Sequence, residues 1–187
     1  MADSSANQEK KVTVIGARDA EGVFGPQGQQ LIPVVSAPQS GASGISACVV
    51  HMPPGRVSRP HYHDHNEIIV VCIEGYAATL VGPEQTPVFH GPGEFIYIPE
   101  GVIHTAVNLS KDNRLIAFET RTDPMFNEDV VMSPEVVETA AKAAAELQEK
   151  FAKGELDLPA HWDITNFQPY NFDVEAETRQ PETKPAA

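Results

Sequence analysis

The chain has 187 residues, and at roughly 150 residues per domain this length corresponds to one domain with a remainder. Apolar residues make up 41% of the sequence, which is enough for a hydrophobic core. The formal net charge of −13 argues against binding to nucleic acid or to an anionic membrane, because both require a basic surface.

The sequence also lacks the segments that mark membrane or secreted proteins. Its longest purely apolar run, residues 68–73, is far too short to span a bilayer. No apolar segment follows the N-terminal residues, so we expect no signal peptide. The two cysteines, Cys48 and Cys72, lie within apolar runs, which favours buried thiols in a reducing compartment over a disulfide. We therefore expect a cytoplasmic protein.

Most of the chain has a β pattern. Residues 1–10 are polar, and we expect them to be disordered. Short runs rich in Val, Ile, Phe and Tyr then alternate with glycine and proline, which predicts an all-β sandwich or barrel over residues 11–132 with no helix. The predicted strands are 11–15, 30–35, 45–52, 67–73, 77–81, 87–89, 94–98, 104–108 and 114–119.

The run 67–73 is apolar at both alternating positions, so we expect the core to cover one of its faces and another sheet or subunit to cover the other.

The pattern changes at Ser133, which resembles a helix N-cap followed by Pro134 at the first helical position. Apolar residues then recur at helical spacing as far as Gly154, which suits a C-terminal cap, and this predicts a helix over 133–153. The segment that follows, up to residue 173, is irregular and aromatic, and we expect it to dock on the barrel, with a lid or a dimer strap as the alternatives. Its candidate contact residues are His161, Trp162, Phe167, Tyr170 and Phe172. Residues 174–187 form an acidic tail that we expect to be disordered.

One segment concentrates histidines. His61, His63, His65 and Glu67 occupy alternate positions, so on one extended strand their side chains share a face. Burying three imidazoles and a carboxylate together is costly without a partner, and a divalent metal ion is a partner that suits these donors.

A second segment supplies a further histidine. The predicted strand 94–98 ends at Pro99, Gly101 provides a turn, and His104 opens the next strand. A histidine placed just beyond a rigid turn can complete a metal site that the first segment begins.

The two segments resemble the two sequence motifs of the cupin superfamily. The first has Gly55, five residues, His61, one residue, His63, three residues and Glu67, but seven residues then precede Gly75 where the usual motif has six. The second matches at every fixed position: Gly93, five residues, Pro99, one residue, Gly101, two residues, His104, three residues and Asn108. The stretch that begins Thr120-Arg121-Thr122-Asp123-Pro124 is similar to one in a group of small bacterial cupins without assigned function.

This resemblance implies a jelly-roll β-barrel, usually a homodimer, with one divalent metal ion inside. By matching positions, the ligands are His61, His63, Glu67 and His104. This set leaves an octahedral ion two open positions for substrate or oxygen. Iron or manganese is the favoured ion, and nickel, cobalt or zinc are alternatives.

Other residues have less defined roles. His65 has no counterpart among the ligands and is a candidate to support them or to face solvent. Arg59 is a candidate for binding an anionic substrate, and Arg56 and Arg121 are weaker ones, although a surface ion pair is the favoured explanation for all three. Glu67 is a candidate base. Cys72 alternates opposite to Glu67 and should face away from the metal.

For function, the resemblance implies a metal-dependent enzyme acting on a small organic molecule, with a dioxygenase as the first choice. An isomerase, cyclase or lyase that uses the ion as a Lewis acid is the second. A non-catalytic module that binds a small ligand is the third.

Overall fold

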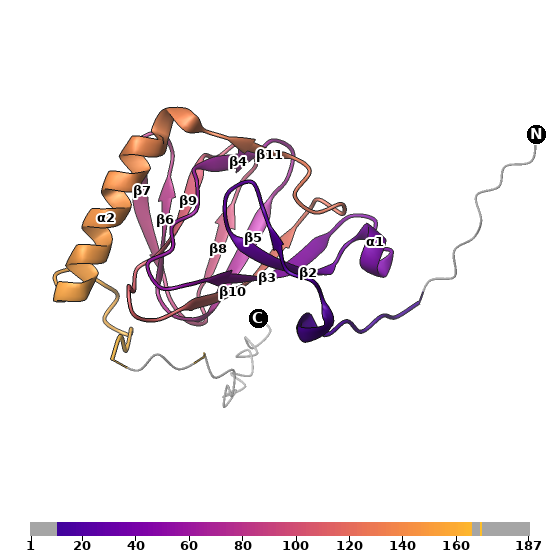
Figure 1. The fold of residues 1–187 in the computed structure, drawn as a ribbon, viewed down its shortest axis with the longest axis horizontal. Coiled ribbons are helices and arrows are strands. Elements are labelled where there is room, and N and C mark those ends of the chain that lie inside the picture. Colours follow the sequence, from indigo (N-terminus) through magenta and orange to yellow (C-terminus); the bar gives the residue numbers. More distant parts are fainter. Residues whose placement is uncertain (1–10, 166–168, 170–187) are drawn as a thin grey trace, which may run out of the picture.

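The computed structural model describes residues 11–165 and 169, and its core consists of two antiparallel sheets that face each other (Figure 1). The fold is the predicted all-β jelly roll with a C-terminal helix. The six-stranded sheet has the order β1 (Val23–Phe24), β2 (Gln30–Val35), β3 (Ser46–Met52), β10 (Leu115–Arg121), β5 (Ile68–Glu74), β8 (Phe95–Ile98). The five-stranded sheet has the order β11 (Val130–Met132), β4 (His61–His63), β9 (His104–Asn108), β6 (Ala77–Val81), β7 (Thr86–His90).

The sequence pattern located most strands to within two residues. Strands β2, β6 and β9 have the predicted bounds. The predicted strand 11–15 is wrong: Val12 and Val14 are 93% and 94% exposed, and no strand of the described residues pairs with this segment. An alternating pattern forms a stable strand only when another strand pairs with it.

Short elements account for the remaining differences. We expected no helix before residue 132, and this is wrong. The 3₁₀ turn η1 (Ala17–Asp19) and the single helical turn α1 (Ala37–Ser40) both precede it. One turn is too short to show apolar periodicity. In the predicted helix 133–153, a 3₁₀ turn, η2 (Pro134–Val136), precedes α2 (Val137–Lys153), and the Ser133 side chain makes no capping hydrogen bond. Gly154 ends α2 in the left-handed conformation, as predicted, with φ of 68°.

Helix α2 covers the outer face of the five-stranded sheet (Figure 1). Ala140, Ala144 and Phe151 recur on one side of the helix and pack against outward-facing residues of β6 and β9. On the same side, Gln148 donates hydrogen bonds to the carbonyl oxygens of Gly55 (3.0 Å) and Asn108 (2.8 Å). The helix is thereby fixed to the end of β9.

The segment after α2 docks on the same side of the barrel. Trp162 lies against Tyr76 with ring centroids 4.9 Å apart, and its indole nitrogen donates to Glu94 (3.0 Å). His161 also contacts the Glu94 carboxylate at 3.0 Å. Phe167, Tyr170 and Phe172 lie outside the described residues, so their predicted docking is not tested. Residues 1–10 and 174–187, which we expected to be disordered, also lie outside them.

The two faces of β5 have different surroundings. Ile68, Val70 and Cys72 point into the barrel. Cys72 therefore alternates opposite to the exposed Glu67, as predicted, but it lies on the inner face, where we expected a side chain facing away from the metal. Both cysteines are free and buried in the interior cluster, and burial raises the pKa of both thiols. On the outer face Ile69 is exposed, beside Phe95 and Tyr97 of β8.

Among the described residues, neither helix combines the length and the hydropathy needed to cross a membrane.

Candidate metal centre

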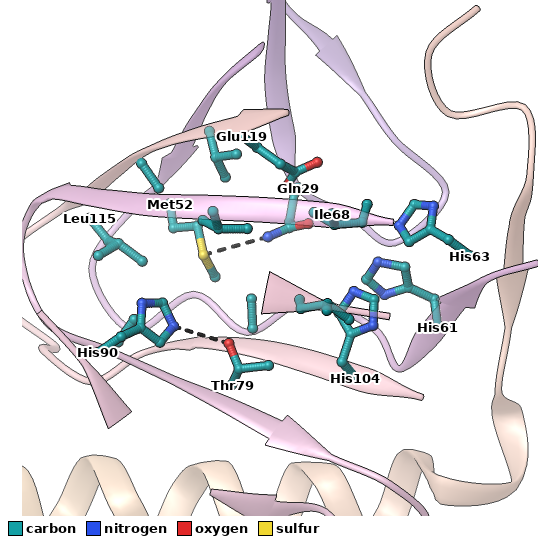
Figure 2. Close-up of a pocket in the computed structure, with 16 residues that line it drawn as sticks. Gln29, Met52, His61, His63, Ile68, Thr79, His90, His104, Leu115 and Glu119 are labelled. Carbon is teal, nitrogen blue, oxygen red and sulfur yellow. Dashed lines mark hydrogen bonds between the residues drawn. The ribbon is translucent and has the colours of Figure 1, made fainter. Parts of the chain in front are cut away.

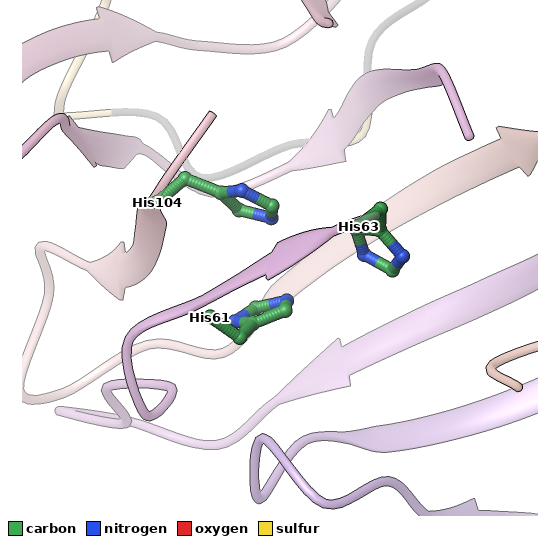
Figure 3. A group of neighbouring side chains, drawn as sticks. All are labelled: His61, His63 and His104. Atoms are coloured by element: carbon green, nitrogen blue, oxygen red, sulfur yellow. The ribbon is translucent and has the colours of Figure 1, made fainter. Parts of the chain in front are cut away.

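Three histidines come together at one end of the barrel interior (Figure 3). His61 and His63 lie at alternate positions of β4, so both rings point to the same face, and His104 on the neighbouring β9 lies opposite His61. All three are buried, and one nitrogen from each ring lies within 4.8 Å of one nitrogen from each of the others. The ring centroids of His61 and His104 are 4.3 Å apart.

Hydrogen bonds fix the orientation of every ring. The Nδ1 atom of His61 is 2.8 Å from the carbonyl oxygen of Arg59, and that of His104 is 2.9 Å from the carbonyl oxygen of Val102. The Nδ1 atom of His63 is 3.0 Å from the Asp129 carboxylate. Carbonyl oxygens only accept, so Nδ1 carries the proton in His61 and His104, and Nε2 is the nitrogen left to bind an ion.

The three rings are neutral at physiological pH. Burial lowers the pKa of His61 well below its usual value, and the neighbouring His104 lowers it further. Burial also lowers the pKa of His104, to about 4, and together with Arg121 it lowers the pKa of His63. Because metal ions bind deprotonated imidazole, these nitrogens need lose no proton first. The donor chemistry therefore fits a divalent ion.

Asp129 supports this arrangement from the loop before β11. Besides contacting His63, its carboxylate accepts a hydrogen bond from Nδ2 of Asn66 at 2.5 Å. Burial alone raises the pKa of Asp129, but the hydrogen bonds from His63 and Asn66 outweigh burial and lower it. A charged carboxylate behind an imidazole increases the basicity of the metal-binding nitrogen. The sequence analysis missed Asp129 because it reaches β4 only through the pairing of β11 with β4.

Replacing Asp129 by asparagine should weaken metal binding roughly 10- to 100-fold, the usual effect of losing such a supporting carboxylate. An amide can still accept the hydrogen bond from His63, but it supplies no negative charge. Competition with a chelating dye measures the affinity. Asp64→Asn is the matched control, because Asp64 is exposed and pairs only with His65 at 3.2 Å. Equal affinities for the two variants would contradict the role of Asp129.

The predicted fourth ligand, Glu67, lies elsewhere. Its side chain is exposed and accepts a hydrogen bond from the Tyr97 hydroxyl on the outside of the six-stranded sheet. Strand β4 ends at His63, and a bend at residues 64–65 breaks the alternation on which the prediction depended. The role of Glu67 as a base loses its basis for the same reason.

The other predicted site residues also lie outside the cluster. His65 is exposed at the bend and pairs with Asp64, so it does not approach the three histidines. The exposed Arg59 guanidinium lies 3.4 Å from the carbonyl oxygen of Pro26, and Arg56 donates to that of Gly28. These two arginines hold the loop between β1 and β2, and neither lines the cavity.

A largely enclosed cavity extends from the histidines into the barrel (Figure 2). The volume open to water-sized groups inside it is about 40 Å³, enough for a small ligand group or a few water molecules. Its walls are mainly apolar. The polar residues on its lining, besides the three histidines, are Gln29, Thr79, His90 and Glu119.

Glu119 belongs to a buried ion pair that sequence analysis did not predict. Nε of Arg121 donates to Glu119 Oε1 at 2.5 Å, and the two side chains are only 1% and 9% exposed. Arg121 also donates to Asn127 Oδ1 at 2.6 Å and lies over the Phe126 ring, 4.6 Å from its centroid. Of the three arginine candidates, this buried one is therefore near the histidines, close enough to affect the pKa of His63.

Comparison with known proteins identifies the family. The Cupin family model matches residues 15–149. The chain belongs to the cupin family. A search of curated proteins finds no match.

Solved cupin structures share the fold at low sequence identity. The polyketide cyclase RemF from Streptomyces resistomycificus is 22% identical, with a TM-score of 0.54 over 68% of this chain and 92% of its own. A double-stranded β-helix protein from Klebsiella pneumoniae is 15% identical, with a TM-score of 0.52 over 66% of this chain and 98% of its own. Oxalate decarboxylase from Lactobacillus farciminis is 18% identical, with a TM-score of 0.52 over 76% of this chain and 40% of its own.

The unusual spacing in the first cupin motif has a structural consequence. Counting the usual six residues back from Gly75 leads to Ile68 rather than to Glu67. Ile68 lines the cavity, whereas Glu67 is outside. In this cupin an aliphatic side chain therefore lies where the usual spacing leads, and the cluster consists of nitrogen donors alone.

Acid should destabilise the metal-free cupin through His90. Burial lowers the pKa of His90 from 6.5 to about 4. Between these pH values the unfolded chain takes up a proton that the folded chain does not, so stability falls as the pH falls, by about 3 kcal/mol in total. Urea unfolding of wild type and His90→Leu at several pH values isolates this contribution. The prediction is wrong if stability declines equally in both proteins.

Proposed function

We propose that this cupin is a metal-dependent enzyme acting on a small organic molecule, and that the reaction is a dioxygenation. One observation carries the proposal: three buried histidines, each oriented through Nδ1, turn their free nitrogens toward a mainly apolar cavity. A ligand set of this kind without a carboxylate leaves the bound ion its full positive charge, and the ion would supply a centre for oxygen and for an anionic substrate.

The chain's own residues account for the rest of the site. His61, His63 and His104 would hold the ion, with Asp129 behind His63. All-nitrogen sets suit iron, nickel, copper and zinc, whereas manganese favours oxygen ligands, so iron is our first choice. The Arg121 guanidinium beside the cluster favours an anionic head group on the substrate. The walls of the cavity are mainly apolar and exclude water.

Oxygen uptake tests this proposal. The full chain is purified, its metal content is measured, and the protein is reconstituted with Fe(II) without oxygen. Catechol-like compounds, β-diketones and keto acids are then offered with oxygen. We expect about one equivalent of metal per chain and oxygen consumption with at least one substrate class. Substrate binding without turnover under any metal would instead identify a non-catalytic binding module.

A second candidate is an isomerase, cyclase or lyase that uses the ion as a Lewis acid, and the buried Glu119 carboxylate favours it. Glu119 lines the same cavity as the histidines and could accept or return a proton of a bound substrate. Exchange of substrate hydrogen with deuterated water, under zinc and without oxygen, would support this candidate. Glu119→Gln should abolish the exchange.

We also propose a homodimer in a reducing, cytoplasmic compartment. The outer face of β5, β8 and β10 carries Ile69, Phe95, Tyr97 and Phe118, which are 38–68% exposed in the single chain. A second copy would cover this apolar face, and the free, buried cysteines suit a reducing compartment. Light scattering coupled to gel filtration, with Phe95→Glu as the test variant, measures the assembly.

A further inference from the structure

The end of the cavity farthest from the three histidines, here called the inner end, contains polar groups that do not belong to the metal centre. In Figure 2, His90 lies toward the opposite end of the drawn residues from His61 and His63, with Thr79 on the side of His90 that faces them and Gln29 between. His90 comes from the end of β7, and Thr79 lies on the neighbouring β6, two residues beyond the position paired with His90. Both line the same cavity as the three histidines.

His90 has a hydrogen-bonding atom without a partner. Its ring is 7% exposed, and Nε2 contacts Thr79 Oγ1 at 3.0 Å. Nδ1 is buried and makes no hydrogen bond to any described residue. Leaving such an atom unpaired costs about 1–3 kcal/mol, so a buried polar atom without a protein partner points to an occupant.

Gln29 is nearly as poorly satisfied. It is buried on the cavity wall, and the hydrogen bond of its Nε2 atom goes to Met52 Sδ at 3.7 Å. A thioether sulfur is a weak acceptor, so a better acceptor from a ligand can replace it. His90 and Gln29 thus have hydrogen-bonding capacity that the protein does not fully satisfy, and both lie in mainly apolar walls beyond the metal centre.

The charges around His90 restrict what can bind there. Because burial lowers the pKa of His90 to about 4, its ring is neutral at pH 7. The nearest charged group to act on His90 is the Glu94 carboxylate, which lies outside the cavity. Among the described residues, Glu119 is the only ionisable one on the lining apart from histidines, so an anionic ligand group at the inner end would lack a counter-ion beside it. A neutral imidazole has one donor and one acceptor, and a hydroxyl group can pair with Nδ1 in either tautomer.

We infer that the inner end of the cavity is a subsite for a neutral hydroxyl group, at the tail of a short, slender ligand whose anionic head lies at the histidine centre. The inference rests on the proposed function, because the metal centre defines where the head binds. It adds a substrate class: molecules with an oxygen-donor head, an apolar body and a distal hydroxyl.

Binding of matched probes tests the subsite. The zinc-loaded full chain is titrated calorimetrically with the short ω-hydroxycarboxylates from 3-hydroxypropanoate to 6-hydroxyhexanoate and with the corresponding n-alkanoates. At the chain length that spans the cavity, we expect the hydroxyl to tighten binding about 5- to 10-fold, the effect of one hydrogen bond to a buried partner. His90→Leu should remove this preference while retaining alkanoate binding. His51→Leu is the control, because His51 lies outside the cavity and pairs with Gln30 at 3.1 Å.

A spectroscopic measurement on the wild-type chain tests the subsite even if His90→Leu does not fold. In the wild-type chain labelled with ¹⁵N-histidine, the preferred hydroxy acid should shift the Nδ1 resonance of His90, and the matched alkanoate should not. Thr79→Val, which removes the hydroxyl that contacts Nε2, should change the His90 resonances without removing the subsite.

Failure of this inference is distinguishable from failure of the proposed function. If zinc binds and the alkanoates bind only to the zinc-loaded chain, but the hydroxyl gives no preference at any length, the subsite is refuted and the metal site stands. If no probe binds, or if His90 shows the same resonances with every probe, water is the occupant and the inference is also wrong. Absence of metal binding would overturn the proposed function first.

Discussion

His104→Ala is expected to abolish metal binding under conditions in which the wild-type chain holds about one equivalent. His104 is the only member of the cluster contributed by β9, and without it two nitrogens on one strand remain. The affinity should fall more than roughly 100-fold, beyond the effect of losing a supporting hydrogen bond. Elemental analysis after dialysis and titration with Fe(II), Co(II) and Zn(II) measure the loss.

His51→Ala provides the matched control for this prediction. His51 is a histidine on the outer side of β3, next to Gln30, and it does not line the cavity. Its loss should leave the metal content unchanged. Equal metal content in His104→Ala and wild type would mean that the ion binds elsewhere, and the proposed function would lose its basis. Thermal unfolding with and without metal adds a second criterion, since only a protein that binds the ion gains stability from it.

The strands could be predicted because local signals define them. Alternating or continuous apolar runs between glycine and proline placed β2, β6 and β9 with their correct bounds. The same signals failed at residues 11–15, where alternation is present but a partner strand is not. Whether a strand pairs depends on the rest of the chain, and no local pattern contains that information.

The candidate site was predictable only in part, for a similar reason. His61 and His63 share a strand, so their common face follows from alternation, and the turn before His104 indicated its place. Extending the alternation to Glu67 was wrong because a bend intervenes. The spacing to Gly75, one residue longer than usual, was the signal in the sequence that could have exposed this error.

The remaining site residues depend on tertiary structure. Asp129 reaches His63 through the pairing of β11 with β4, and Glu119 faces the histidines from the opposite sheet. A strand's inward and outward positions are fixed only when its register is known. On β10 both ionisable residues, Glu119 and Arg121, share the inward face with Leu115 and Ala117, which the sequence alone could not establish.

Arg121→Met is expected to destabilise the metal-free protein by about 3–5 kcal/mol, because it leaves the Glu119 carboxylate buried without its partner. Methionine retains much of the volume of the arginine stem. The free energy of unfolding is obtained from urea titrations of metal-free protein, so that ion binding does not contribute. Arg114→Met is the matched control: Arg114 forms two hydrogen bonds with Glu74 at 2.9 and 3.0 Å, but its side chain is 58% exposed, so its loss should cost at most about 1 kcal/mol.

Replacing both partners, with Glu119→Leu and Arg121→Met, should restore most of that stability, since buried ion pairs contribute little net energy beyond apolar residues of similar volume. If the double variant is as unstable as Arg121→Met, the pair has a structural role and the prediction is wrong. If the double variant is stable and retains the metal affinity of wild type, the fold and the ion binding do not require the pair. An ion pair with those properties, whose Glu119 carboxylate lines a cavity with three histidines, is then best explained by what it does to a bound substrate, with Glu119 at a substrate proton and Arg121 holding that carboxylate in place.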